Sequence, residues 1–311
     1  MKIAILDDYQ DCVKTLDCFS LLKNHEVIVL NHHYDDPTEL LSHLKGVQAL
    51  VLIRERTNVN EALLSKLPDL KLIAQTGKAG RHLDLKACEA HGVQVLETEG
   101  TSTATAEFTL LMILASLRHF EAEVNHMRKG QWQRHLGRQL RGRTLGIYGL
   151  GKIGVQVAQT AHTLGTNILI WGREASQTKA KEMGWQFASS RSDFFSQSDV
   201  LCLVLRLTPE THGIVKAQDL SLMKPDAILV NTARAELIEN GALEAALKKG
   251  RPGFAAVDVY EKEPVLDSNH PMLKLPNCLC TPHLGFVEKD NYENYLNQAF
   301  HKINDFSTNH T

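Results

Sequence analysis

Three glycines, Gly149, Gly151 and Gly154, have the spacing of a dinucleotide-binding turn. An apolar run, TLGIY, precedes them, and the helix-like stretch VQVAQTAHTLG follows. In such a turn Gly149 allows a tight bend, Gly151 lets a pyrophosphate approach the backbone, and Gly154 lets helix and strand pack closely. The phosphates would bind N–H groups at the helix N-terminus. A glycine-rich structural turn and the nucleotide site of a methyltransferase are the alternatives.

The next apolar run, NILIW, ends at Gly172 and Arg173, where a site for NAD(H) commonly has an acidic residue that binds the ribose hydroxyls. An acidic side chain would repel a 2′-phosphate, whereas a guanidinium binds a phosphate through two hydrogen bonds. The sequence therefore predicts NADP(H) as the preferred cofactor, with NAD(H) as the alternative. A solvated arginine at a strand end would explain Arg173 without any phosphate.

Short apolar runs alternate with helix-like patterns along most of the chain. This alternation predicts βαβ units, and therefore α/β domains with parallel sheets that are covered on both faces. We expect two such domains, one helix from about Thr105 to Met127 that leads into the second, and an amphipathic last helix that packs on the first. The strand-like runs are KIAILDD, HEVIVLN, ALVLIRE and LKLIAQTG, then TLGIYGLG, NILIWGR, DVLCLVL, AILVNTA, GFAAVDV and CLCTPH.

The composition is that of an ordinary globular protein, with 43% hydrophobic and 23% charged residues and a net charge of −2. This balance predicts neither a nucleic-acid surface nor a membrane surface. No apolar run approaches the roughly 18 residues of a membrane span, and the N-terminus lacks a signal-peptide pattern, so we expect a cytoplasmic protein. The six cysteines form no CxxC pair, and we expect Cys278 and Cys280 to point to opposite faces of a strand. We therefore predict no metal site.

Seven stretches, in order along the chain, resemble the D-isomer-specific 2-hydroxyacid dehydrogenase family, and among its members the glyoxylate and hydroxypyruvate reductases. The resemblance implies a discontinuous, flavodoxin-like substrate-binding domain of residues 1–100 plus 287–311. It also implies a Rossmann dinucleotide-binding domain of residues 101–286, and a homodimer built on that domain. The stretches are TGKAGRHLDLKACEAHGVQVLET, TAEFTLLMILA, RTLGIYGLGKIG, LTPETHGIV, VNTARAELIENGAL, DVYEKEP and TPHLG.

The resemblance assigns a catalytic set to His283, Glu263 and Arg234. His283 matches the general acid/base of the family, and an imidazole titrates in the range that this role requires. Glu263 matches the carboxylate that orients the imidazole, and Arg234 matches the residue that binds the substrate carboxylate and polarises its carbonyl. Taken alone, each would have an ordinary structural explanation.

The same resemblance assigns the binding residues. The loop TGKAG matches the loop whose backbone N–H groups bind the substrate carboxylate, so Gly77, Lys78 and Ala79 are predicted to bind substrate. Arg54 either lines the substrate cleft or forms a surface ion pair. Asp258 and the carbonyl of Ala233 are expected to bind the nicotinamide carboxamide. The full predicted cofactor set is Gly149, Leu150, Gly151, Lys152, Ile153, Gly154, Gly172, Arg173, Arg206, Thr208, Thr232, Ala233 and Asp258.

Three departures from the family pattern bear on specificity. The usual HLPLT is VLRLT here, which places Arg206 beside the adenosine end of the cofactor, where it fits a 2′-phosphate or faces solvent. Lys78 and Arg81 replace residues that are commonly apolar and acidic, so Lys78 either binds a second anionic group or points to solvent. Phe286 follows Gly285 where small residues are frequent, and either narrows the pocket or fills a subunit contact.

We therefore predict an oxidoreductase that prefers NADP(H), interconverts D-2-hydroxy acids and 2-oxo acids, and reduces small 2-ketoacids such as glyoxylate or hydroxypyruvate. The alternative is a dinucleotide-sensing, corepressor-like binding protein of the same fold. A sensor of that kind would bind dinucleotide and reduce ketoacids negligibly. A methyltransferase would bind S-adenosylmethionine instead.

Overall fold

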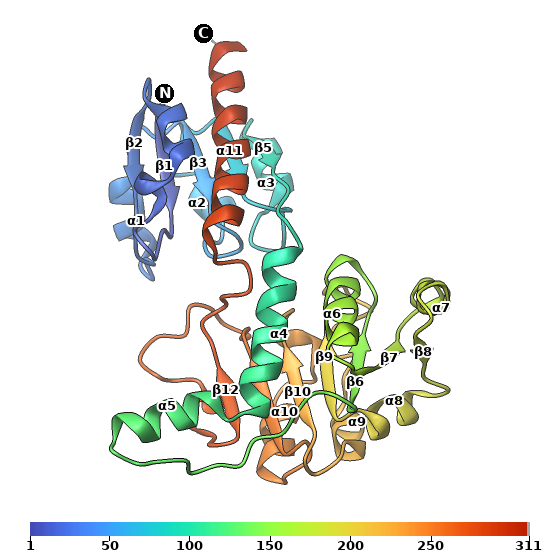
Figure 1. Cartoon of the computed structure of the whole chain (residues 1–311). Helices are drawn as coiled ribbons and strands as arrows, with labels where there is room; N and C mark the ends of the chain where they lie inside the picture. The colour runs from blue at the N-terminus through green and yellow to red at the C-terminus, as the bar shows by residue number, and fades with distance from the viewer. Residues whose placement is uncertain (310–311) are drawn as a thin grey trace. The chain divides into compact units, whose positions relative to one another are not determined.

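The computed structural model describes residues 1–309, and the chain divides into two α/β units (Figure 1). Unit 1 contains Met1–Thr101 and the C-terminal residues from Glu288, and unit 2 is Ser102–Val287. The predicted domain boundaries lie one residue from these. Each unit has one parallel sheet with helices around it, so the predicted class, two doubly wound α/β domains, is confirmed.

Unit 1 has a five-stranded sheet in the order β2-β1-β3-β4-β5, which is the flavodoxin-like order. Its central strands are buried on both faces, as in a parallel sheet that is covered on each side. The last helix, α11, packs against η2, β4 and β5 of this unit. The strands are β1 (Lys2–Leu6), β2 (Glu26–Val29), β3 (Ala49–Leu52), β4 (Leu72–Gln75) and β5 (Gln94–Glu97), and the helices are η1 (Val13–Thr15), η2 (Asp17–Leu22), α1 (Pro37–His43), α2 (Glu61–Leu64), α3 (Leu85–Ala90) and α11 (Lys289–Asn309).

Unit 2 has a seven-stranded sheet in the order β12-β11-β10-β9-β6-β7-β8. The strand order reverses between β6 and β9, and ligands of such sheets bind at the carboxyl ends of the strands at this point. The strands are β6 (Thr144–Tyr148), β7 (Asn167–Trp171), β8 (Gln186–Phe187), β9 (Val200–Leu203), β10 (Ile228–Asn231), β11 (Phe254–Val257) and β12 (Cys278–Cys280). The helices are α4 (Thr103–Leu117), α5 (Phe120–Arg128), α6 (Lys152–Thr163), α7 (Glu174–Glu182), α8 (Arg191–Gln197), α9 (Ala217–Leu222), η3 (Ala235–Leu237), α10 (Ala242–Lys248) and η4 (Pro271–Lys274).

The sheet of unit 2 has a hydrophobic core on each face. Successive residues of a strand point to opposite faces, and accordingly Leu229 belongs to one core and Val230 to the other. The first core includes Phe194 and Phe195, and the second includes residues of α4 and α6. Burial on both faces fixes the strands rigidly, and the turns at their carboxyl ends therefore have a rigid base.

The prediction of a single helix from Thr105 to Met127 is wrong, because the structure has two helices there. Helix α4 ends at Leu117, and His119 adopts a left-handed backbone conformation (φ 49°) before α5 begins at Phe120. A left-handed residue cannot continue a right-handed helix. Helix α4 packs against α6, β10 and β11 within unit 2, whereas α5 has no buried residue.

The expectation for Cys278 and Cys280 is also wrong, since their sulfur atoms lie 3.6 Å apart. Residues two apart in a strand share a face, and these two therefore point the same way along β12. Over residues 1–309, no helix combines the length and the apolar character that crossing a membrane would require.

Candidate active site

The glycine turn joins β6 to α6 at the point where the strand order reverses. Gly149 has φ +94°, and a Cβ there would lie 2.8 Å from Cδ2 of Leu205. A Cβ on Gly154 would lie 2.5 Å from the backbone oxygen of Gly149, which no side chain can accommodate without moving the helix. By contrast, a Cβ on Gly151 would have no atom within 4 Å. The protein itself requires the first and third glycines, whereas the space beside the second fits a ligand.

These features fit a dinucleotide, whose pyrophosphate would lie beside Gly151 at the N-terminus of the twelve-residue helix α6. Gly151 is the N-cap residue, and as a glycine it has no side chain that could cap the helix. The predicted residues of this turn divide by exposure: Leu150 is buried in the unit 2 core, Ile153 is half-buried, and Lys152 is exposed. Lys152 is thus the cation nearest in sequence to the turn.

Gly172 and Arg173 follow β7 and lie beside the glycine turn. A Cβ on Gly172 would be 3.7 Å from Cα of Gly149 and 2.7 Å from Oγ of Ser176. Arg173 is the exposed N-cap residue of α7. Hydrogen bonding from Thr208, aided by the charge of Arg173, lowers the pKa of Glu210 below its ordinary value. One predicted cofactor residue, Thr208, thus bonds to a carboxylate of its own loop, which also feels the charge of a second, Arg173.

Arg206 lies on the loop that follows β9, and its side chain is exposed. The loop folds back on itself, because Oγ1 of Thr211 donates to the carbonyl of Arg206 at 2.7 Å and accepts the N–H of Thr208 at 2.7 Å. Upstream in this loop, Val204 approaches the glycine turn: a Cβ on Gly154 would be 3.1 Å from its Cγ2.

His283 and Glu263 form a hydrogen-bonded pair in unit 2. Nδ1 of His283 lies 2.6 Å from Oε2 of Glu263, and Oε1 of Glu263 accepts the backbone N–H of Tyr260 at 2.9 Å. A carboxylate at Nδ1 fixes the tautomer with the proton on that nitrogen, so that Nε2 is the nitrogen available for a reacting group. The ring of Phe286 stands edge-on to the imidazole, with centroids 5.3 Å apart. This buried phenylalanine therefore fills the space on one side of the His283 ring within unit 2.

Asp258 holds the loop that carries His283. Its fully buried carboxylate accepts hydrogen bonds from Oγ1 of Thr281 at 2.7 Å and from the N–H groups of Leu284 at 2.7 Å and Gly285 at 2.8 Å. Burial raises the pKa of this carboxyl group above its ordinary value, although these hydrogen bonds oppose the rise. The assignment of Asp258 to the nicotinamide carboxamide missed this positioning role, because the sequence does not reveal which backbone amides a carboxylate reaches.

Arg234 lies on the turn after β10, which is shaped by Asn231. The side chain of Asn231 donates to the carbonyl of Arg234 at 2.8 Å and accepts the N–H of Ala233 at 3.1 Å. Nη1 of Arg234 donates to the carbonyl of Ala233 at 2.7 Å, which is the carbonyl predicted to bind the carboxamide. The hydroxyl of Thr232 pairs with that of Thr109 at 2.7 Å in the interior. Asn231 is not among the residues predicted from the sequence, where its place at a strand end is its only signal.

Adjacent parallel strands carry the three catalytic candidates. Arg234 follows β10, Glu263 comes after β11, and His283 comes after β12. Their turns therefore lie at one edge of the sheet, the edge at which the glycine turn follows β6.

The residues predicted to bind substrate lie in unit 1. Arg54, at φ +60° after β3, donates through Nη1 to Tyr295 Oη at 3.3 Å, and a Cβ on Gly77 would lie 2.0 Å from that same nitrogen. A side chain at position 77 would require this guanidinium to move, and the positive φ of Gly77 (+84°) also favours glycine there. Lys78 Nζ lies 2.8 Å from Oε2 of Glu97, and the N–H of Ala79 donates to Oε1 of Glu97 at 2.8 Å. The predicted carboxylate-binding loop thus binds a carboxylate of its own chain.

Comparison with known proteins gives a consistent result. Residues 110–285, more than half of the chain, match the family described as D-isomer specific 2-hydroxyacid dehydrogenase, NAD binding domain. The chain is 37% identical over 282 residues to a glyoxylate reductase of Aeropyrum pernix, covering 87% of this chain and 83% of that protein. It is 35% identical over 250 residues to a D-3-phosphoglycerate dehydrogenase of Methanocaldococcus jannaschii, covering 79% of this chain but only 47% of that longer protein.

A solved structure, described as a phosphoglycerate oxidoreductase from Vibrio cholerae O395, superposes with a TM-score of 0.97 at 52% identity, over 99% of each chain. The sequence match, the two parallel sheets and the dinucleotide turn agree. The chain belongs to the D-isomer-specific 2-hydroxyacid dehydrogenase family, a family of oxidoreductases with a nicotinamide dinucleotide-binding domain.

Proposed function

We propose that the protein reduces a small 2-ketoacid to the D-2-hydroxy acid and prefers NADPH as the reductant. The observation that carries this proposal is the 2.6 Å hydrogen bond between His283 Nδ1 and Glu263 Oε2, which leaves Nε2 for the substrate oxygen. When bound, the nicotinamide supplies the hydride that reduces the keto carbon.

In this mechanism the chain supplies the proton and the charges. Protonated His283 donates the proton on Nε2 to the carbonyl oxygen as that oxygen gains negative charge. Glu263 stabilises the imidazolium before the transfer and fixes the ring orientation. Arg234 exchanges its hydrogen bond to Ala233 for the substrate carboxylate, which it can bind through two N–H groups.

The substrate assignment has two candidates. Glyoxylate or hydroxypyruvate is favoured by the 37% identity to a glyoxylate reductase that is covered over most of its length. A phosphorylated three-carbon ketoacid is favoured by the 52% identity to a structure described as a phosphoglycerate oxidoreductase, and by the exposed cations Lys78 and Arg81. We favour the small unphosphorylated acids, because the chain covers 83% of the Aeropyrum pernix glyoxylate reductase but only 47% of the Methanocaldococcus jannaschii D-3-phosphoglycerate dehydrogenase.

The deciding experiment is the oxidation of NADPH and of NADH by the purified protein with glyoxylate, hydroxypyruvate and 3-phosphohydroxypyruvate. We expect the highest kcat/KM for NADPH with glyoxylate or hydroxypyruvate. The highest value with the phosphorylated acid would replace the substrate assignment and leave the reaction class intact. Tight dinucleotide binding without turnover of any 2-ketoacid would favour the sensor function.

The preference for NADPH rests on Arg173. Its guanidinium is exposed at the N-terminus of α7, and no side-chain carboxylate occupies Gly172 beside the turn. A charge-assisted pair with a 2′-phosphate contributes about 1.5–3 kcal/mol, so Arg173→Ala should lower kcat/KM for NADPH about 10- to 100-fold and leave NADH unaffected. Lys181→Ala, on an exposed residue of the same helix, is the control. Equal losses with both cofactors would contradict the phosphate assignment.

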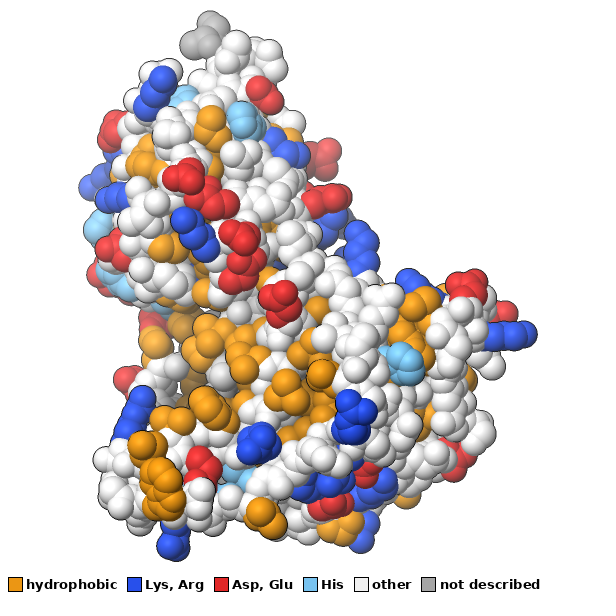
Figure 2. All heavy atoms as spheres, viewed as in Figure 1, with side chains coloured by type: hydrophobic (Ala, Val, Ile, Leu, Met, Phe, Trp, Pro, Cys, Tyr) orange, Lys and Arg blue, Asp and Glu red, His pale blue; other side chains and the backbone are white. Residues whose placement is uncertain are grey.

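We also propose a homodimer built on unit 2. Hydrophobic side chains gather on the surface of this unit over α4 and α5 (Figures 1 and 2). Helix α5 buries none of its residues, and a group of exposed apolar side chains on neighbouring elements commonly marks a subunit contact. Its exposed apolar residues are Leu111, Leu114, Phe120, Met127, Trp132 and Leu136.

A further inference from the structure

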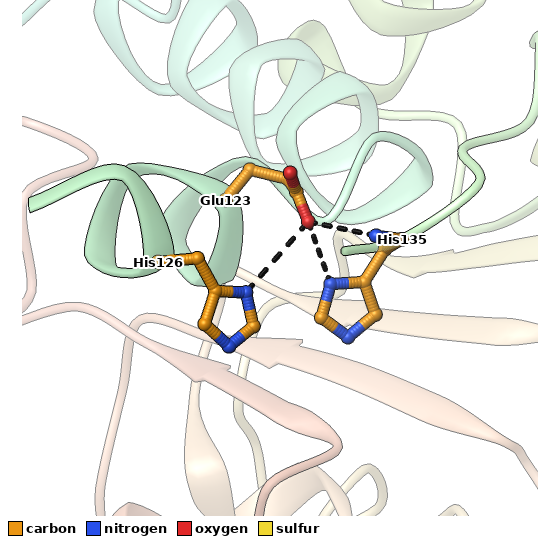
Figure 3. Close-up of side chains that lie close together, drawn as sticks. All are labelled: Glu123, His126 and His135. Carbon is orange, nitrogen blue, oxygen red and sulfur yellow. Dashed lines mark hydrogen bonds and ion pairs between the residues drawn. The ribbon is translucent and has the colours of Figure 1, made fainter. Parts of the chain in front are cut away.

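Two histidines and a glutamate meet outside the active-site edge of unit 2. Figure 3 shows Glu123 and His126 on one face of α5, and His135 on the following segment turned toward them. Nδ1 of His135 lies 2.8 Å from Oε1 of Glu123, and Nδ1 of His126 lies 3.8 Å from the same oxygen. One ligand atom from each residue lies within 4.8 Å of the other two.

His126 has a buried nitrogen that the protein does not satisfy. Among the described residues, no group forms a hydrogen bond with Nδ1 of His126, and this atom is inaccessible to solvent. A buried polar atom without a hydrogen bond is uncommon in a native protein, and an ion is one of its explanations. This nitrogen lies on the Glu123 side of the ring (Figure 3).

The other two ligand groups are held in place. The carboxylate of Glu123 accepts the backbone N–H groups of Arg134 at 3.2 Å and His135 at 2.9 Å. The His135 ring stacks on His126, with centroids 5.3 Å apart and an angle of 13° between the planes.

We propose that Glu123, His126 and His135 bind a divalent transition-metal ion of the zinc class. Two imidazole nitrogens and a carboxylate oxygen are a common ligand set for Zn²⁺, with one position left for water. Ligand atoms at about 2.0–2.1 Å from a tetrahedral ion lie roughly 3.3 Å apart. The distances from Oε1 of Glu123 to Nδ1 of His135 (2.8 Å) and to Nδ1 of His126 (3.8 Å) lie on either side of this value, so small side-chain rotations complete the site.

Metal binding requires a change of tautomer at His135. Its Nδ1 carries the hydrogen-bonding proton toward Glu123 in the metal-free protein, and must offer a lone pair to the ion. The proton therefore moves to Nε2, and both histidines bind as neutral imidazoles. The prediction of no metal site considered only cysteine spacing, and this cluster contains no cysteine.

The ion would join α5 to the segment that follows it. Only Glu123 and His126 belong to the helix, whereas His135 lies in a stretch, residues 129–143, without a helix or strand. This stretch carries Trp132 and Leu136, two of the exposed apolar residues. A bound ion would therefore fix their position relative to α5.

The test is titration of the metal-free, full-length protein with Co²⁺, monitored by visible absorption, and with Zn²⁺, monitored by calorimetry. We expect one ion per chain, with the absorption bands of tetrahedral Co²⁺. Since the loss of a group that merely supports a ligand costs about 10- to 100-fold in affinity, His126→Ala and His135→Ala should each cost roughly 100-fold or more. His91→Ala is the matched control, because His91 pairs with Glu61 at 2.8 Å and lies outside this cluster. His283→Ala tests whether the ion binds at the pair of His283 and Glu263 instead.

Absence of binding, or equal affinity in parent, His126→Ala and His135→Ala, would overturn the proposal. Circular dichroism and ketoacid reduction should be unchanged in both variants. If His126→Ala does not fold, His135→Ala carries the test, since its side chain is exposed. Zn²⁺ should also slow tryptic cleavage after the exposed Arg134 in the parent and not in His135→Ala. Equal cleavage rates with and without Zn²⁺ would overturn the connection between α5 and this segment.

Discussion

At the scale of single residues, Glu263 and Glu261 are two glutamates of one loop with different partners. Glu263 is bonded to His283 at 2.6 Å, whereas Glu261 pairs with His270 at 3.0 Å. Only the first pair includes the proposed proton donor. Comparing variants of the two glutamates therefore separates the effect on catalysis of the carboxylate bonded to His283 from the effect of a negative charge elsewhere in the loop.

We therefore expect Glu263→Gln to lower kcat for ketoacid reduction by roughly 100-fold or more, since it removes the group that stabilises the charged acid. Steady-state rates with saturating NADPH measure this loss, and dinucleotide binding should be unchanged. Glu261→Gln is the control and should retain nearly full activity. Similar losses in both variants would show that general electrostatics, and not the pairing with His283, is responsible.

At the scale of elements, the glycine turn offers a matched pair of substitutions. Gly154→Ala places a methyl group 2.5 Å from the carbonyl of Gly149, so α6 must move away from β6. Such overpacking costs about 1–3 kcal/mol, and we expect a fall in Tm of several degrees. Gly151→Ala meets no protein atom, so Tm should be unchanged while the Kd for NADPH rises. Calorimetry and fluorescence titration separate the two effects, and equal stability of both variants would contradict this division of roles.

A second prediction concerns the base of the unit 2 sheet, where Asp199 joins β6 to the segment before β10. Burial opposes ionisation of Asp199, but hydrogen bonds from Lys224 Nζ at 2.7 Å and the N–H of Thr144 at 2.8 Å hold its pKa below the ordinary value. Because the pKa is lower in the folded state, this stabilisation is present above the unfolded pKa and is lost as the pH falls through the folded value.

Asp199→Asn should accordingly lower the free energy of unfolding by about 1–2 kcal/mol at pH 7, with the difference from the parent vanishing in strong acid. Urea unfolding at several pH values measures it. Asp226→Asn breaks an exposed pair with Arg138 and should cost less than about 1 kcal/mol. A loss in Asp199→Asn that does not depend on pH would contradict the assignment to ionic hydrogen bonds.

The sequence predicted some of these elements correctly and missed others. Continuous apolar runs identified the parallel strands, and the glycine spacing located the turn, because both are local patterns. The break at His119 was missed because an apolar periodicity continues through it, and nothing local requires a left-handed residue there. The partners of Asp258 and Glu97 were missed for another reason: they lie 18 to 27 residues away, and only folding brings them together.

At the scale of the whole molecule, the proposed dimer makes a prediction about mass. Leu136 is 94% exposed, and burying a charge at a subunit contact is costly. We expect Leu136→Asp to shift the protein from dimer to monomer in light scattering coupled to size exclusion. Leu85→Asp, on an exposed residue of α3 in unit 1, should leave the dimer intact. A monomeric parent protein would refute the proposal directly.

The carboxylate of Glu97 has a consequence for how the enzyme responds to its substrate. Held by Lys78 and the amide of Ala79, it is a tethered ligand of the loop that the sequence predicts to bind the substrate's acid group. Tethering gives such a group an effective concentration on the order of millimolar. A substrate carboxylate must therefore displace the Glu97 carboxylate before it can bind this loop. The reaction rate would then respond to substrate over a higher range of concentrations than the affinity of the empty loop alone would give.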